Sequence, residues 1–329
     1  MESCCPNKCS SAPSKINYNI QRVSPPLELG EGPHWHQCTQ SLYFVDLHKK
    51  KINKYHPETS CYTTATIDCC DPLTFIIPVD NQSNTFLVGL GPAIGIVRWN
   101  GCSNTAEYRY LKTVDKTPGN RLNDAKADAS GRLWVGSMGP EIDDNSGQYH
   151  KCRGSLYSVD FDGTVTKRLP NISISNGMAW SPDNKFFYYI DTYKYAVEAY
   201  NFDLASGNIS NGKVIFDFRC KNITGDPDGM TIDTDGNLWV ACFNSNHIIK
   251  INPNTSSVLT TIEFPAYQIT SAAFGGPNLD QLYVTTASYQ TTDAQKSKLP
   301  YSGTLFRVLG TCSTGFNGVP VKINLCALN

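Results

Sequence analysis

One short apolar and aromatic segment recurs along nearly the whole chain, and this repeat is the strongest constraint on the fold. Successive copies begin 44 to 54 residues apart. The six copies are Leu42–Val45, Phe86–Gly89, Leu133–Gly136, Phe187–Ile190, Leu238–Ala241 and Leu282–Thr285. A period in this range is typical of the blades of a β-propeller, so six copies predict six blades.

Each copy is followed by a second segment in which apolar and polar residues alternate, as in a strand with one buried face. These segments are Ile52–Tyr55, Ile96–Trp99, Ser155–Val159, Val197–Phe202, Ile248–Ile251 and Thr304–Val308. The sequence therefore predicts an all-β fold, a six-bladed β-propeller with four-stranded antiparallel blades over residues 17–329. Residues 1–16 are expected to form a disordered tail.

A propeller ring closes by pairing strands from the two ends of the chain, because closure removes exposed sheet edges. The candidate closing strands are Asn19–Val23 near the N-terminus and Val319–Leu325 near the C-terminus.

Composition excludes several kinds of partner. The formal net charge is −1, and no Lys/Arg run exceeds Lys49–Lys51, so nucleic acid is not expected to bind. No apolar stretch approaches the ~18–20 residues that a membrane helix needs, so no membrane association is expected. The first residues contain no apolar signal region, and the 13 cysteines form no CxxC pair. We expect a cytoplasmic protein, a monomer, that acts on a small molecule.

Polar residues occupy one register just before the repeated strands. They stand in Gly30-Glu31-Gly32-Pro33, Leu122-Asn123-Asp124-Ala125, Ser175-Asn176-Gly177-Met178 and Pro227-Asp228-Gly229-Met230. The first strand of every blade lines the central channel of a propeller, so these positions should converge although they are far apart in sequence. The alternative is local, because Asn-Gly, Asp-Gly and Glu-Gly are also common turn residues.

If Glu31, Asn123, Asn176 and Asp228 converge, their like charges repel unless a cation lies between them. All four side chains offer oxygen, and oxygen ligands favour a hard cation. Calcium tolerates irregular ligand shells better than magnesium does, so one divalent cation, calcium by preference, is predicted. Zn²⁺, Mn²⁺ and Mg²⁺ are possible substitutes. His34 and His36 form a second, weaker metal candidate, which we interpret as a surface feature of an exposed strand edge.

At these residues the chain resembles the SMP-30/gluconolactonase/regucalcin-like family, and within it insect regucalcin-like and luciferin-regenerating proteins. The stretches that carry the likeness are Gly30–Trp35, Asn120–Asp124, Ile174–Trp180, Pro227–Met230 and Ala273–Asp280. The resemblance implies that Glu31, Asn176 and Asp228 bind the metal. It also implies that Arg121, Asn123 and Glu141 contact the substrate, with Asn123 alternatively on the metal through water.

The expected activity is the calcium-dependent hydrolysis of a small lactone or ester, with Asp228 as the general base or as the nucleophile. Three alternatives remain open at this stage. The same site could hydrolyse an organophosphate, it could serve a luciferin-regenerating reaction, or the protein could be a non-enzymatic calcium-binding regulator.

Overall fold

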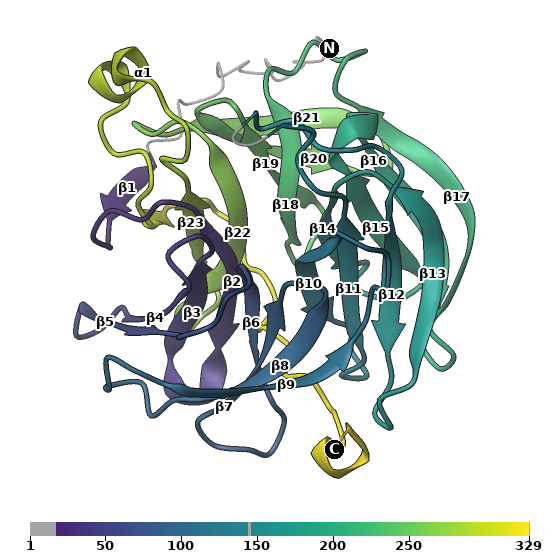
Figure 1. Cartoon of the computed structure of the whole chain (residues 1–329). Coiled ribbons are helices and arrows are strands. Elements are labelled where there is room, and N and C mark those ends of the chain that lie inside the picture. The colour runs from purple at the N-terminus through teal and green to yellow at the C-terminus, as the bar shows by residue number, and fades with distance from the viewer. Residues whose placement is uncertain (1–17, 144–145, 329) are drawn as a thin grey trace, which may run out of the picture.

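The computed structural model describes residues 18–143 and 146–328, which form six four-stranded antiparallel sheets (Figure 1). The innermost strands contact one another in a closed cycle, so the sheets are the blades of a propeller. The predicted all-β, six-bladed architecture is confirmed. The expected tail over residues 1–16 lies outside the described residues.

Two strand layers lie nearest the axis. The innermost strands are β2 (Gly30–His36), β6 (Leu73–Pro78), β10 (Arg121–Ala127), β14 (Ser175–Trp180), β18 (Asp226–Ile232) and β22 (Ile269–Gly275). The second strands, which contain the six repeated segments, are β3 (Ser41–Asp46), β7 (Thr85–Leu90), β11 (Leu133–Met138), β15 (Phe186–Asp191), β19 (Leu238–Phe243) and β23 (Gln281–Thr286). We number the blades 1 to 6 in this order.

Two further layers complete each blade. The third strands are β4 (Lys51–His56), β8 (Ala93–Arg98), β12 (Gly154–Val159), β16 (Ala196–Asp203), β20 (His247–Asn252) and β24 (Phe306–Leu309). The outer strands are β5 (Cys61–Thr66), β9 (Glu107–Thr113), β13 (Val165–Ile172), β17 (Asn208–Asp217), β21 (Ser257–Glu263) and β1 (Asn19–Arg22).

The burial of the strands explains why the second strand gave the clearest sequence signal. Second strands such as β3, β7 and β11 are buried at every residue, since neighbouring blades cover both of their faces. Such strands are apolar almost throughout, whereas outer strands such as β9 and β21 are mostly exposed. In the described part of the chain, six apolar clusters form the core, and each lies between two neighbouring blades.

Helical structure is minor. The described helices are α1 (Asp293–Lys298) and the 3₁₀ turns η1 (Gln37–Thr39), η2 (Thr192–Lys194) and η3 (Leu325–Leu328). The side chains of Thr292 and Gln295 form a capping box at the start of α1. Within residues 18–143 and 146–328, no helix combines the length and apolarity needed to cross a bilayer.

Ring closure differs in one respect from the sequence prediction. The N-terminal prediction is confirmed, because β1 pairs antiparallel with β24 and forms the outer strand of blade 6. The C-terminal prediction is wrong, since Val319–Leu325 is no strand of any blade. The chain after β24 instead crosses the end of the propeller away from α1, making single bridges such as Gly315 with Asp233 and Val321 with Val79 (Figure 1). An extended apolar segment can therefore be held by main-chain contacts to several blades without joining a sheet.

Candidate functional site

A β-bulge interrupts the innermost strands of blades 3, 4 and 5 at one register, and it positions three of the predicted site residues. In blade 1 the bulge falls at Gly32-Pro33, and Glu31, paired with Val45, directly precedes it. The pairing of β10 with β11 shifts between Leu122 and Ala125, so Asn123 and Asp124 face a single residue of β11. The same two-against-one shift occurs in β14 at Asn176-Gly177 and in β18 at Asp228-Gly229. Bulges re-aim side chains at a chosen point of a strand. The turn alternative is therefore wrong for these three pairs, which lie inside strands.

The glycines of two bulges are required by the crowding of the innermost strands. A Cβ on Gly177 would lie 2.5 Å from Cβ of Met230 and 2.8 Å from the carbonyl oxygen of Asp228. A Cβ on Gly229 would lie 2.1 Å from Oγ of Ser271. Glycine thus follows Asn176 and Asp228 because the next blade is in contact there.

Three carboxylates act on one another at this level of the channel. Asp228 is only 6% exposed, and burial, followed by the negative charges of Glu31 and Asp124, raises its pKa well above the ordinary value. Burial and the charge of Asp124 raise the pKa of Glu31 to about 8, against the opposing effects of the Gly32 N–H and Arg121. Burial also raises the pKa of Asp124, although Lys126 opposes this shift. The structure therefore brings Glu31 and Asp228 together and adds Asp124, which our sequence interpretation did not assign.

The two asparagines are joined by a hydrogen bond. Nδ2 of Asn123 donates to Oδ1 of Asn176 at 3.1 Å and to the carbonyl oxygen of Ser175 at 2.8 Å. Nδ2 of Asn176 donates to Oγ1 of Thr192 at 2.7 Å, and this hydroxyl donates to the carbonyl oxygen of Pro227 at 2.9 Å. Thr192 therefore fixes the orientation of the Asn176 amide. It belongs to η2, which follows the second strand of blade 4, so no feature of the axial register in the sequence could have revealed it.

The predicted substrate residues lie at the same end of the channel. Nη1 of Arg121 donates to Oδ1 of Asn123 at 2.7 Å and to the carbonyl oxygen of Leu122 at 2.9 Å. The Arg121 charge acts on Glu31 and also on Tyr149. Tyr149 bonds through its side chain to Glu141, and the two residues form an isolated backbone bridge. The charge of Arg121 thus acts both on the axial residue Glu31 and on Tyr149, the hydrogen-bond partner of Glu141 farther from the axis.

Aromatic side chains lie beside Glu141 at this end of the channel. The hydroxyl of Tyr289 donates to Oε1 of Glu141 at 3.5 Å, and the Tyr289 ring stacks on His48 with centroids 4.4 Å apart. The backbone N–H of Tyr149 donates to the hydroxyl of Tyr193 at 3.1 Å. We call His48, Tyr149, Tyr193 and Tyr289 the aromatic rim. Sequence reasoning missed it because its members come from four separate loops.

The donors at the axis fit a hard divalent cation. Glu31 and Asp228 are desolvated carboxylates that repel each other, and the Asn176 amide, held by Thr192, is at the same level. Among the described residues, no group of three or more His, Cys, Asp and Glu side chains is placed to hold a metal ion. The candidate donors are the carboxylates of Glu31 and Asp228 and the amide of Asn176, oxygen ligands of the type that calcium takes.

The interpretation of His34 as a surface residue is wrong. His34 is 8% exposed, because β2 is an innermost strand and not an exposed edge, and its Nε2 atom is buried without a hydrogen-bond partner. Burial, with smaller effects of His36 and Lys126, lowers the pKa of His34 to about 3, so the ring is neutral. His36, at the end of β2, is half-buried.

The fold and the site place the chain in one class of protein, the six-bladed propellers that carry carboxylates and amides at one end of the central channel. The chain belongs to the SMP-30/gluconolactonase/LRE-like family, whose model matches residues 29–288. It is 36% identical over 292 residues to regucalcin of Oryctolagus cuniculus, covering 88% of this chain and 93% of the relative. The family resemblance predicted from the sequence is confirmed.

Two solved structures show the same fold. A luciferin-regenerating enzyme superimposes with a TM-score of 0.87 and 41% identity, over 93% of this chain and 100% of its own. A calcium-binding protein, regucalcin, from Agrobacterium tumefaciens superimposes with a TM-score of 0.81 and 24% identity, over 93% and 97% of the two chains.

Proposed function

We propose that the protein is a metal-dependent hydrolase of small lactones or esters. One divalent cation, calcium by preference, would be held by Glu31, Asn176 and Asp228. The observation that carries the proposal is the burial of mutually repelling carboxylates beside an oriented amide, an arrangement that a cation relieves. The family, which includes gluconolactonases, supports the lactone as the substrate class.

The side chains divide the work as follows. A bound cation would polarise the carbonyl oxygen of the substrate and stabilise the negative charge that develops on it. Asp228 is the candidate base for the attacking water, since it is buried and its pKa is raised. Arg121, which is tied to Asn123, offers further N–H donors to the oxygens of the substrate, and Glu141 offers an acceptor farther from the axis.

Asp228 could instead attack the substrate carbonyl as a nucleophile. A single turnover in ¹⁸O-labelled water separates the two roles, with mass analysis of the protein and the product. With Asp228 as base, the label enters the product acid directly. With Asp228 as nucleophile, the alkoxide leaves and a mixed anhydride forms; water that attacks its Asp228 carbonyl leaves the label in the Asp228 carboxylate, which the base route never labels.

The first experiment is hydrolysis of gluconolactone by protein treated with EDTA, before and after Ca²⁺, Zn²⁺, Mn²⁺ or Mg²⁺ is added. We expect loss of activity with the chelator and recovery with Ca²⁺, and at least a ~100-fold loss of kcat in Asp228→Asn. Asp226→Asn is the matched control, because this half-buried carboxylate lies on the same strand, accepts a hydrogen bond from Asn244 and acts on Asp228 through its charge alone. Calcium binding without turnover of any lactone, ester or organophosphate would favour the non-enzymatic calcium-binding regulator.

The aromatic rim favours a second candidate reaction at the same site, on a planar aromatic substrate. The aromatic rim surrounds the entrance to the candidate site. The rings of the stacked His48–Tyr289 pair, of Tyr149 and of Tyr193 offer flat faces against which such a substrate could stack. The 41% identity to the luciferin-regenerating enzyme supports this alternative. Comparing kcat/KM for a sugar lactone and an aryl ester, in the native protein and in Tyr289→Leu, decides between them. If the aromatic rim binds the substrate, Tyr289→Leu lowers kcat/KM for the aryl ester and leaves kcat/KM for the sugar lactone unchanged.

A further inference from the structure

The opposite end of the channel contains a separate chamber of about 200 Å³. The innermost strands locate it, because their first residues lie at the candidate metal site and their last residues line the chamber. On β10 the order is Asn123 and then Lys126, and on β18 it is Asp228 and then Ile232. Strands rise by about 3.3 Å per residue, so the two ends are roughly 10 Å apart.

The channel is narrow between the two ends. A cavity of about 20 Å³, lined by Asp124, Lys126 and His34 among others, lies at this level. Since one water needs at least about 10–15 Å³, this space has room for a water but not for a substrate. The chamber is therefore a site of its own and not an extension of the candidate metal site.

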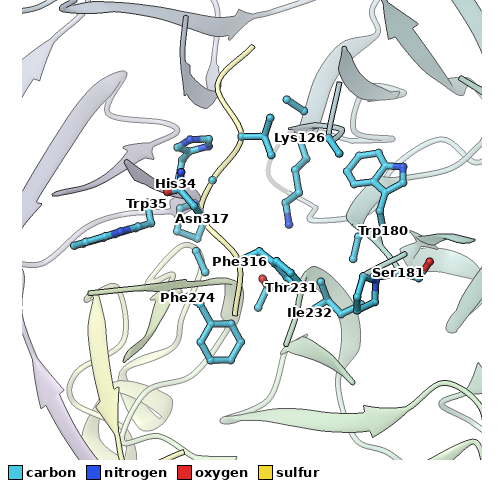
Figure 2. A pocket seen from close by; sticks show the side chains of 18 of the residues that line it. His34, Trp35, Lys126, Trp180, Ser181, Thr231, Ile232, Phe274, Phe316 and Asn317 are labelled. Carbon is cyan, nitrogen blue, oxygen red and sulfur yellow. The ribbon is translucent and has the colours of Figure 1, made fainter. Parts of the chain in front are cut away.

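Apolar side chains make up most of the chamber wall. Trp180, Ile232 and Phe274 come from three blades, and Phe316 comes from the C-terminal segment that crosses this end (Figure 2). That segment is fixed by hydrogen bonds from the Gly318 N–H to the carbonyl oxygen of Trp35 and from the Gln37 N–H to Oδ1 of Asn317. Phe316 is nevertheless 44% exposed, so an aromatic ring borders both the chamber and solvent.

The chamber has one charged group. Among the described residues that line it, Lys126 is the single Lys or Arg, His34 is neutral, and no Asp or Glu is present. Figure 2 shows the Lys126 amine extending into the space between Trp180 and Phe316. In the described part of the chain, this amine makes one hydrogen bond, to the carbonyl oxygen of Met230 at 2.8 Å. An ammonium group has three donors, so two remain for a ligand. His34 also lines the chamber, but its Nε2 is buried beside Gly318 and is not exposed to a ligand there.

We propose that this chamber binds a compact organic anion, a single-ring or similarly sized monocarboxylate, with its carboxylate on Lys126 and its apolar body against Trp180 and Phe316. The size argues for one ring, since a cavity of about 150 Å³ accommodates benzene. The charge argues for an anion, because the chamber wall supplies Lys126 and no carboxylate. Asp124, whose charge also acts on Lys126, lines the small adjacent cavity and not this wall. The proposal is independent of the reaction proposed for the other end.

The test uses full-length protein in EDTA, titrated with 4-fluorobenzoate and with 4-fluorobenzamide and followed by ¹⁹F NMR. The two probes match in shape and differ in charge. We expect the acid to bind at least about tenfold more tightly than the amide, since only the acid offers Lys126 a charged hydrogen-bond partner. Lys126→Met should remove this preference, whereas Lys185→Met, which changes an exposed lysine near the same end, should not. Equal binding of acid and amide, or no binding of either, would overturn the proposal.

Two further variants test at which end of the channel the anion binds. Ala273→Leu narrows the chamber without changing its charge and should weaken the acid and the amide alike. Arg121→Met removes the cation at the other end and should leave the acid affinity unchanged. If Arg121→Met abolishes binding and Ala273→Leu does not, the anion binds at the candidate metal site and the proposal fails. Thermal unfolding of each variant shows that it is folded, and the preference of the native protein for the acid tests the charge argument even if Lys126→Met does not fold.

Discussion

At the axis, protons and a metal cation compete for the same two carboxylates, Glu31 and Asp228. Burial raises the pKa of both. The charge of Asp124 adds to the shift of Glu31, which reaches about 8, and the charges of Glu31 and Asp124 add to the shift of Asp228. A carboxyl group with a higher pKa in the folded chain than in the unfolded chain binds its proton more tightly when folded. The stability of the metal-free protein therefore falls as the pH rises from about 4.5 towards 8.

Calcium should reverse this loss. We expect a larger rise in Tm on adding Ca²⁺ at pH 8 than at pH 5, because at pH 5 protons compete for the same oxygens. At a hundredfold excess over Kd, binding to the folded state stabilises it by about 2.7 kcal/mol. Differential scanning fluorimetry at both pH values, with EDTA as the reference, measures the effect. An equal rise in Tm at the two pH values would contradict the prediction.

Glu31→Gln should separate stability from binding. The change keeps the shape of the side chain and removes one of the repelling charges. The metal-free variant should therefore have a higher Tm than the native protein at pH 8, and its affinity for Ca²⁺ should fall by at least about tenfold, since a charged ligand is lost. Calorimetric titration with Ca²⁺ gives the affinity. A lower Tm without metal would show that Glu31 stabilises the channel by some other contact.

The sequence identified the residues at the bulges because it repeats polar side chains at one register in several blades. It could not identify Asp124, Thr192 or His34 as parts of the channel. Asp124 is adjacent to a predicted residue, and only the two-against-one bulge shows that both positions are placed at the axis. Thr192 contributes through a turn after a different strand, and the burial of His34 depends on the place of β2 in the ring.

At the scale of elements, a repeated aspartate secures the turn between the first and second strands of blades 3 and 5. In blade 5, Oδ2 of Asp233 forms an ion pair with Lys250 at 2.8 Å and accepts a hydrogen bond from Nε1 of Trp239 at 3.1 Å. Its Oδ1 accepts a hydrogen bond from the backbone of Asn237 at 2.9 Å. Asp128 binds Arg132 and Trp134 in the same way in blade 3. The turn is thus joined to the buried tryptophan of the second strand.

Asp233→Ala should lower the free energy of unfolding by about 3–5 kcal/mol, because Lys250 and Trp239 lose a buried acceptor. Asp235→Ala, in the exposed part of the same turn, should change it by less than about 0.5 kcal/mol. Urea unfolding followed by tryptophan fluorescence measures both variants. Equal effects would mean that the turn sequence matters and the buried contact does not.

The sequence predicted the strands of the blades well because each second strand is covered on both faces and is apolar almost throughout. It failed for Val319–Leu325, since an apolar extended segment does not reveal its partners. Which strands pair depends on the closed ring as a whole. The partner of β1 is β24, a strand that the sequence did predict, so no further C-terminal strand is needed to close the ring.

At the scale of the whole molecule, the C-terminal segment ties blades together. The backbone N–H groups of Val321, Lys322 and Asn324 donate to carbonyl oxygens of Pro78, Gly131 and Phe161, which belong to blades 2 and 3. Val321 is fully buried in the apolar cluster between these two blades. That the protein is a cytoplasmic monomer stays a prediction. Light scattering on the purified protein measures its molar mass and so tests the monomer.

If this segment belongs to the cooperative unit of the propeller, a single change in it should destabilise the whole ring. Val321→Ala removes two buried methyl groups and should lower the free energy of unfolding by about 2 kcal/mol. Val319→Ala, at a half-buried position of the same segment, should have a smaller effect. Because the six clusters join every blade to its neighbours, urea unfolding should remain a single transition with an unchanged m-value in both variants. A separate early transition in Val321→Ala would show that the segment detaches on its own and that closure by β1 and β24 alone holds the ring together.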